Sequence, residues 1–125
     1  MLKRAPWDAD AAACWQAGDE GKILGCLTAS SLTDIFYIAR KQKGQTVALN
    51  AVRLCLDTFA ICLIDRKALE EAADLLGQDF EDNLQIACAT LAGLDAIVTR
   101  DKDGFRDSLI PALTPSELLT QLQAP

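Results

Sequence analysis

Short apolar runs alternate with helix-patterned segments along this chain. "KILGCLTA", "FAICLI" and "DAIVT" each have the length and composition of a strand, and "FAICLI" is typical of a strand buried on both faces. No hairpin signal joins one of these runs directly to the next, so the helices between them act as crossover connections and the strands become parallel. The pattern predicts an α/β fold, built as a three-layer α/β/α sandwich around a mostly parallel central sheet.

The helices expected between these runs have recognisable ends. Asp65 and Asp79 are each placed to cap a helix, and Ser30 or Ser31 is placed to cap another. For the last helix, the motif "TPSE" from Thr114 supplies a cap, a proline at the first helical position and a capping-box acid. Before this last helix, the sequence predicts helices over residues 6–18, 31–44, 46–57, 65–77 and 79–93.

The size and charge of the chain limit its possible classes of function. At 125 residues, half of them apolar, the chain fits one globular domain, which we expect to span residues 1–125. Its net charge of -6 argues against passive binding to nucleic acid through a basic surface, because phosphate contact needs Lys and Arg. An acidic chain can still be a nucleic-acid enzyme if several of its carboxylates hold metal ions.

The side chains available for catalysis are also restricted. Histidine is absent, which excludes Ser-His and Cys-His catalysis and His-ligated zinc. The cysteines lie in apolar settings without C-x-x-C spacing, so we interpret them as buried thiols of a reducing compartment, with a reactive thiol as the alternative. They are Cys14, Cys26, Cys55, Cys62 and Cys88. Neither a secretory signal nor a membrane-spanning run is present, so we expect a soluble, cytoplasmic protein without membrane contact.

Acidic residues from three segments are expected at one edge of the sheet. Asp34 lies one turn into the helix that follows the first strand, and Asp101 comes just after the strand "AIVT". Asp79 and Asp82 open the helix before that strand, with a spacing that puts them on one helix face and turns Glu81 away. Converging carboxylates repel each other unless a hard cation lies between them, so Mg²⁺ or Mn²⁺ is the expected cofactor. Such a cation can cleave a phosphodiester without histidine.

Each of these acids also has a purely structural interpretation. Asp79 is suited to be an N-cap, and Glu81 a solvated acid that favours the helix dipole. Asp34 can be a first-turn acid beside the cap of its helix, and Asp82 can complete a capping box with Asp79. Asp101 can be a turn residue in "DKDG". Taken singly, the acids do not decide between the two interpretations.

Three longer stretches resemble a known family. "TASSLTDIFYIARKQKG", "DFEDNLQIACATLAGLDAIVTRDKDGF" and "IPALTPSELL" are similar to the PIN-domain family, in the branch near the toxin ribonucleases of bacterial toxin-antitoxin pairs. The resemblance runs from about Pro6 to Leu119, and the middle stretch is its most specific part. It implies a metal-dependent ribonuclease on an α/β/α sandwich, whose clustered acids bind Mg²⁺ or Mn²⁺.

The resemblance assigns roles to individual acids of this chain. Asp34 stands at the family's helix acid, which is usually a glutamate, so its carboxylate is set back by one methylene here. Asp82 matches the acid before the alanine-rich helix, and Asp101 matches the more variable fourth position. These three are the expected catalytic residues. Together with Asp79, a common accompaniment in this branch, they are the expected metal ligands.

The N-terminus departs from the family pattern. PIN domains begin with an apolar strand that ends in an aspartate, whereas this sequence begins at "MLKRAPW", and neither Asp8 nor Asp10 follows an apolar run. We therefore expect the first strand and its acid to be missing. A truncated start, a repurposed domain, and an oligomer that fills the gap all fit this departure.

Two functions of different classes follow from the resemblance. The first is an endoribonuclease in which basic residues guide the RNA backbone, although such residues are also typical of solvated helix ends. They are Arg40, Lys41, Lys43, Arg100 and Lys102. The second is a catalytically silent PIN-like module that associates with an antitoxin or with itself as a homo-oligomer. A nucleotide-binding module is disfavoured because the sequence has no glycine-rich phosphate loop.

Overall fold

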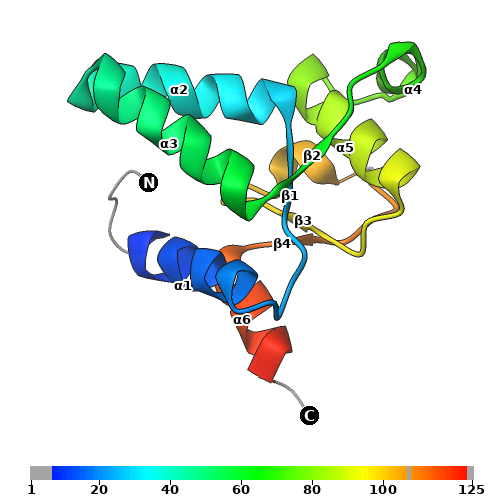
Figure 1. Cartoon of the computed structure of the whole chain (residues 1–125). Coiled ribbons are helices and arrows are strands. Elements are labelled where there is room, and N and C mark those ends of the chain that lie inside the picture. The colour runs from blue at the N-terminus through cyan, green and yellow to red at the C-terminus, as the bar shows by residue number, and fades with distance from the viewer. Residues whose placement is uncertain (1–6, 107, 124–125) are drawn as a thin grey trace. The chain divides into compact units, whose positions relative to one another are not determined.

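The computed structural model describes residues 7–106 and 108–123, and it divides into two compact units, Met1–Ile61 and Cys62–Pro125 (Figure 1). The expectation of a single domain over residues 1–125 stays a prediction. Pro6, expected to open the first helix, lies outside the described residues. Within the described residues, no helix is long and apolar enough to cross a membrane.

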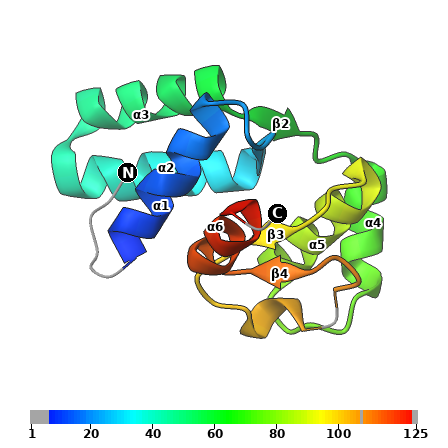
Figure 2. The same ribbon diagram turned by 90° about the horizontal axis from the view of Figure 1, so that it is seen from below.

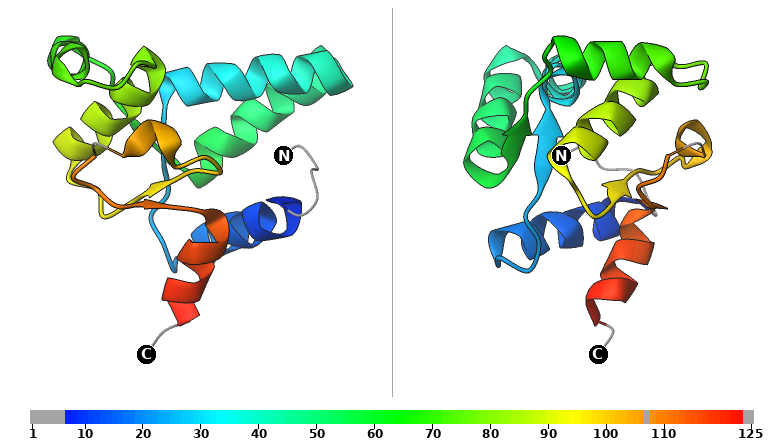
Figure 3. Two further views of the ribbon diagram at one scale, coloured as in Figure 1. Left: turned by 180° about the vertical axis from the view of Figure 1, so that it is seen from behind. Right: turned by 90° about the vertical axis from the view of Figure 1, so that its right-hand side faces the viewer.

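The first unit is mainly helical. It is built from α1 (Trp7–Asp19), β1 (Cys26–Thr28), α2 (Ala29–Lys43), α3 (Gln45–Thr58) and β2 (Ala60–Cys62). The helices α2 and α3 pack against each other (Figure 3), and β1 pairs with β2 in a two-stranded sheet. Each expected helix and strand in this part of the chain is therefore present.

The cap of α2 differs from the prediction. Neither Ser30 nor Ser31 is the N-cap, because both lie inside the helix, which begins at Ala29. Thr28 ends β1 in an extended conformation, and its Oγ1 accepts a hydrogen bond from the Ser31 backbone N–H at 3.1 Å. The strand thus ends directly in the cap, and Asp34 becomes the sixth residue of α2 instead of a first-turn acid.

The second unit carries the remaining elements. They are α4 (Arg66–Asp74), α5 (Phe80–Ala92), β3 (Ile97–Val98), the 3₁₀ helix η1 (Asp103–Phe105), β4 (Ala112–Leu113) and α6 (Pro115–Gln123). Asp65 caps α4 by accepting from the Ala68 N–H at 3.0 Å, as predicted, although α4 ends at Asp74, before Gly77. Gly93 ends α5 in the left-handed conformation, with φ 67° and ψ 36°, which glycine adopts without steric cost.

Strands β3 and β4 form a short parallel pair (Figure 2). The Ile97 N–H donates to the Pro111 carbonyl at 2.9 Å, and the Thr99 N–H donates to the Leu113 carbonyl at 2.8 Å. In a parallel pair the two carboxyl ends meet at one edge. The turn after β3 and the start of α6 after β4 therefore lie next to each other, which positions the site described below.

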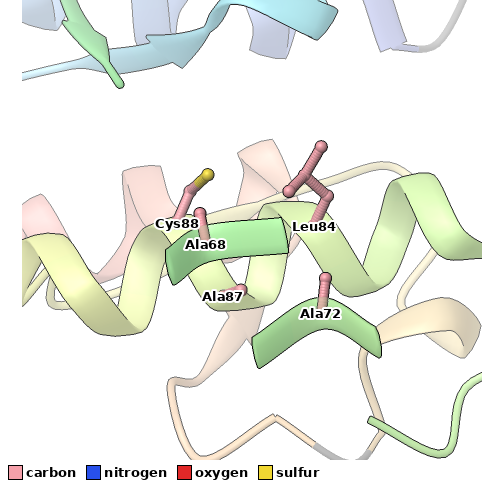
Figure 4. Packing of buried hydrophobic residues seen from close by; sticks show 5 residues of the cluster. All are labelled: Ala68, Ala72, Leu84, Ala87 and Cys88. Atoms are coloured by element: carbon pink, nitrogen blue, oxygen red, sulfur yellow. The ribbon is translucent and has the colours of Figure 1, made fainter. Parts of the chain in front are cut away.

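Small side chains form the core of the second unit (Figure 4). Ala68 and Ala72 of α4 lie beside Leu84, Ala87 and Cys88 of α5, and all five are buried. Alanines at a helix crossing let the two backbones approach closely, so α5 is held firmly against α4. This packing fixes the helix whose first turn carries Asp82.

The α/β class is confirmed, but the strands are shorter and less buried than predicted. In the part of the chain that the structure describes, the four strands have two or three residues each and form two two-stranded sheets. The expectation that "FAICLI" is buried on both faces is wrong, because Ala60 and Ile61 are exposed in β2. Cys55 and Cys88 are buried as expected, and burial raises the pKa of both thiols, which favours the structural interpretation of these two cysteines.

Candidate functional site

The first turn of α5 holds two of the predicted site residues. Asp79 is the N-cap, and its Oδ1 accepts a hydrogen bond from the Asp82 backbone N–H at 3.1 Å. The structural interpretation of Asp79 is thus confirmed. Asp82 is the third residue of the helix, and its side chain is half-buried while that of Asp79 is exposed. Asp79 therefore fixes the backbone that presents the carboxylate of Asp82.

The turn after β3 presents a third predicted acid. Asp101 accepts a hydrogen bond on Oδ1 from the Asp103 N–H at 2.9 Å, so it is a turn residue, as its sequence context suggested. Thr99 Oγ1 accepts from the Asp101 N–H at 3.2 Å and donates to the Asp101 carbonyl at 3.1 Å. These contacts hold Asp101 at the carboxyl end of β3, which is the edge where ligands bind in open α/β sheets.

Gly104 brings the turn onto the start of α5. A side chain at this position would overlap the carboxylate of Asp82, so the Asp82 side chain lies directly against the Gly104 backbone. The next residue, Phe105, is buried, and η1 contacts α5 through this region. The absence of a side chain at position 104 therefore allows Asp82 to approach the turn that carries Asp101.

The three predicted acids, Asp79, Asp82 and Asp101, share one electrostatic environment. Burial raises the pKa of Asp82 above its ordinary value, and the negative charges of Asp79 and Asp101 raise it further. Each of these effects disfavours the ionised carboxylate. A cation beside these side chains would offset the repulsion between their negative charges.

The donor atoms are all oxygens, the ligand type that hard divalent cations prefer. All three side chains offer carboxylate oxygens, and Mg²⁺ commonly binds through one or two carboxylates while it keeps several waters. Among the residues that the structure describes, no group of three or more His, Cys, Asp or Glu side chains could hold a metal ion. A cation at this place would rest on the carboxylates of Asp82 and Asp101 and on water, and Asp79 would support the helix turn that carries Asp82.

Asp34 lies in the other unit. It is an exposed residue of α2, and its position in the second turn of that helix makes the first-turn interpretation wrong. The structure thus brings together three of the four predicted acids, Asp79, Asp82 and Asp101, within one unit.

The predicted RNA-binding residues have different surroundings. The Arg40 guanidinium lies over the Tyr37 ring, 5.1 Å from its centroid, which is the geometry of a cation–π contact. Lys41 is exposed in the last turn of α2, where a positive charge complements the helix dipole. Arg100 is exposed next to Asp101. Lys102 is already engaged, since its Nζ lies 2.8 Å from Glu117 Oε1.

Sequence reasoning missed one buried polar residue beside Asp82. Asn83 is 4% exposed, and its Nδ2 donates to the Gly77 carbonyl at 2.9 Å, which fastens the loop before α5. The sequence does contain a pattern that predicts its burial. Asn83 lies three and four residues before Ile86 and Ala87, so it shares the buried face of α5 with them. Asn83 thereby holds the segment from which Asp79 and Asp82 project.

Removing the charge of Asp82 is expected to stabilise the fold at neutral pH. In Asp82→Asn the repulsion from Asp79 and Asp101 disappears, and we expect a gain of less than about 1 kcal/mol, because a partly exposed charge is screened. Since the pKa of Asp82 is raised in the folded state, its ionised carboxylate destabilises the wild-type fold at pH values above that pKa. This destabilisation is lost as the pH falls through the raised pKa towards the ordinary value of 3.8, because the carboxyl of the folded protein becomes protonated. Urea unfolding of both proteins would measure the difference in their free energy of unfolding, which should be smaller at acidic pH than at neutral pH.

The exposed acid Asp95 of the same unit provides the control for this prediction. Asp95→Asn makes the same chemical change outside the first turn of α5, so we expect a smaller change in the free energy of unfolding. A loss of stability in Asp82→Asn at neutral pH would contradict the prediction.

Comparison with known proteins gives one match. Residues 1–103 match the family model described as the PIN domain, whereas no curated protein and no solved structure matches the chain significantly. PIN domains have an α/β, nuclease-like fold, generally depend on divalent metal ions and typically bind RNA. The matched segment contains Asp34, Asp79, Asp82 and Asp101. Because the match covers most of the sequence, the chain belongs to the PIN-domain family.

Proposed function

We propose that the protein is a divalent-metal-dependent endoribonuclease, with Asp34, Asp82 and Asp101 as its catalytic acids and Asp79 as a further metal ligand. The observation that carries the proposal is the position of Asp82. Its half-buried carboxylate lies against the turn that holds Asp101, and the charges of Asp79 and Asp101 disfavour its ionised form. In a family that generally depends on divalent metals, such an arrangement is most simply a site for Mg²⁺ or Mn²⁺.

The residues of the chain have separate tasks in this proposal. Asp82 and Asp101 would hold the cation, and Asp79 keeps the first turn of α5 in place. When bound, Mg²⁺ or Mn²⁺ supplies an activated water and positive charge at the phosphodiester. Arg100, directly before Asp101, is placed to contact the RNA backbone near the site, and Arg40 and Lys41 offer positive charge on α2.

Cleavage of single-stranded RNA tests the proposal. We expect a fluorescently labelled RNA to be cut in the presence of Mn²⁺ and to stay intact after EDTA is added, because the acids alone cannot activate water. An RNA that stays intact with both Mn²⁺ and Mg²⁺ would contradict the ribonuclease function.

The stretch from Asp79 to Phe105 resembles the toxin ribonucleases of toxin-antitoxin pairs, which suggests an antitoxin protein as partner. A cytoplasmic location agrees with the buried thiols Cys55 and Cys88, because a reducing compartment preserves thiols.

A second candidate function is a catalytically silent PIN-like module that acts through protein association. The observation that favours it is the surface of α3, where Val47 and Leu54 are both exposed and lie seven residues apart, on the same face of the helix. Large apolar side chains gathered on one helix are typical of interaction surfaces. We expect a homo-oligomer, or a complex with an antitoxin, to cover them. Light scattering of the purified protein would test self-association, and a monodisperse monomer at every concentration would contradict it.

A further inference from the structure

Lys102 and Glu117 form an ion pair next to the candidate metal site. The Lys102 Nζ lies 2.8 Å from Glu117 Oε1, and both side chains are 45% exposed. Lys102 is the residue between Asp101 and Asp103, in the turn that lies against Asp82. A lysine at this position carries its charge on a flexible stem, so the residue that pairs with it decides where that charge lies.

Glu117 is held in place independently of Lys102. Its Oε1 accepts a hydrogen bond from the Thr114 N–H at 2.9 Å, and its own N–H donates to Thr114 Oγ1 at 3.2 Å. This reciprocal capping box confirms the predicted start of α6. Since α6 begins where β4 ends, beside the end of β3, the Glu117 carboxylate is a fixed negative charge at the edge of the site.

The turn does not need the ion pair to keep its shape. Burial of Phe105 anchors η1, and the hydrogen bonds of Asp101 with Thr99 and Asp103 close the turn. An ion pair between exposed side chains contributes little to stability. The main consequence of the Lys102–Glu117 contact is therefore the position of the Lys102 charge.

Without Glu117, Lys102 remains in the turn that carries Asp101 and contacts Asp82. Asp101 is its neighbour in sequence, and Asp82 lies against Gly104 two residues further on. Asp79 adds a third charge, which is close enough to affect Asp82. An ammonium group drawn to these carboxylates would offset part of their negative charge and would compete directly with a divalent cation.

We propose that Glu117 is a positioning residue that holds the Lys102 ammonium away from Asp82 and Asp101 and thereby keeps these carboxylates available to a divalent cation. The inference rests on the proposed metal site, but it concerns the control of that site by residues outside it. Glu117 acts through Lys102 and does not itself contact the cation.

Mn²⁺ binding to the full chain tests this role through Glu117→Gln. Glutamine preserves the capping box and removes the charge that attracts Lys102. We expect Mn²⁺, titrated calorimetrically or followed by the paramagnetic resonance of the free ion, to bind about two- to fivefold more weakly, on the scale of one exposed ion pair. Lys102→Met alone is expected to bind Mn²⁺ as tightly as the wild type or more tightly.

The double variant separates this role from a general effect of charge. If Glu117 acts through Lys102, Glu117→Gln should lose its effect in the Lys102→Met background, so the double variant should bind Mn²⁺ about as tightly as the wild type. An equal loss in both backgrounds would overturn the inference, and so would unchanged binding in Glu117→Gln.

The experiments distinguish failure of the ribonuclease function from failure of the role of Glu117. A wild-type chain that binds no Mn²⁺ would overturn both the metal site and the role of Glu117. Binding of Mn²⁺ with the expected pattern among the variants, but without RNA cleavage, would contradict the ribonuclease and support the role of Glu117.

Discussion

Asp82→Asn is expected to abolish Mn²⁺-dependent cleavage of RNA, with a fall in rate of at least about 100-fold, the scale of losing one group that stabilises the transition state. The Asn side chain has nearly the same shape and can occupy the same place against Gly104, so the fold is retained. What disappears is the carboxylate at the centre of the acidic cluster. Initial rates on a labelled single-stranded RNA would measure the loss.

Asp103→Asn is the matched control for this experiment. It removes one negative charge from the same turn, but the Asp103 side chain pairs with Arg106 at 2.9 Å and is exposed. We expect its cleavage rate to stay within a few-fold of the wild type. Full activity of Asp82→Asn would exclude Asp82 as a catalytic acid. Equal losses in both variants would mean that net charge matters, and not the position of Asp82.

Features set by neighbouring residues could be predicted from the sequence. Asp65, Asp79 and Thr114 cap their helices as expected, because a cap depends only on one side chain and the two or three residues that follow it. The cap of α2 was missed because Thr28, Ser30 and Ser31 are all suitable, and the choice depends on where β1 ends. That boundary is set by pairing with a distant strand.

The candidate site shows the same limit. The positions of Asp82 at a helix start and of Asp101 just after a strand could be predicted, because each follows a recognisable local pattern. The space at Gly104 and the pairing of Lys102 with Glu117 could not, since both depend on how η1 and α6 lie against their neighbours. Contacts between residues far apart in sequence leave no local pattern.

The largest effect on stability is expected from Leu84→Ala. Leu84 is 7% exposed and is the bulkiest member of a core cluster whose other members are Ala68, Ala72, Ala87 and Cys88. These neighbours are too small to fill the space that the lost side chain would leave. We expect the free energy of unfolding to fall by about 2–4 kcal/mol, as measured by urea unfolding. Since domains are commonly stable by only about 5–15 kcal/mol, the loss would be a large fraction of the total.

Leu91→Ala on the same helix separates packing from helix propensity. Leu91 is also in α5 but is 39% exposed, and leucine and alanine differ little in helix propensity. We expect a loss of about 1 kcal/mol or less in this variant. Equal losses at the two positions would contradict the assignment of Leu84 to the core. If instead only Leu84→Ala is strongly destabilised, the contact of α5 with α4 is the packing that supports the helix carrying Asp82.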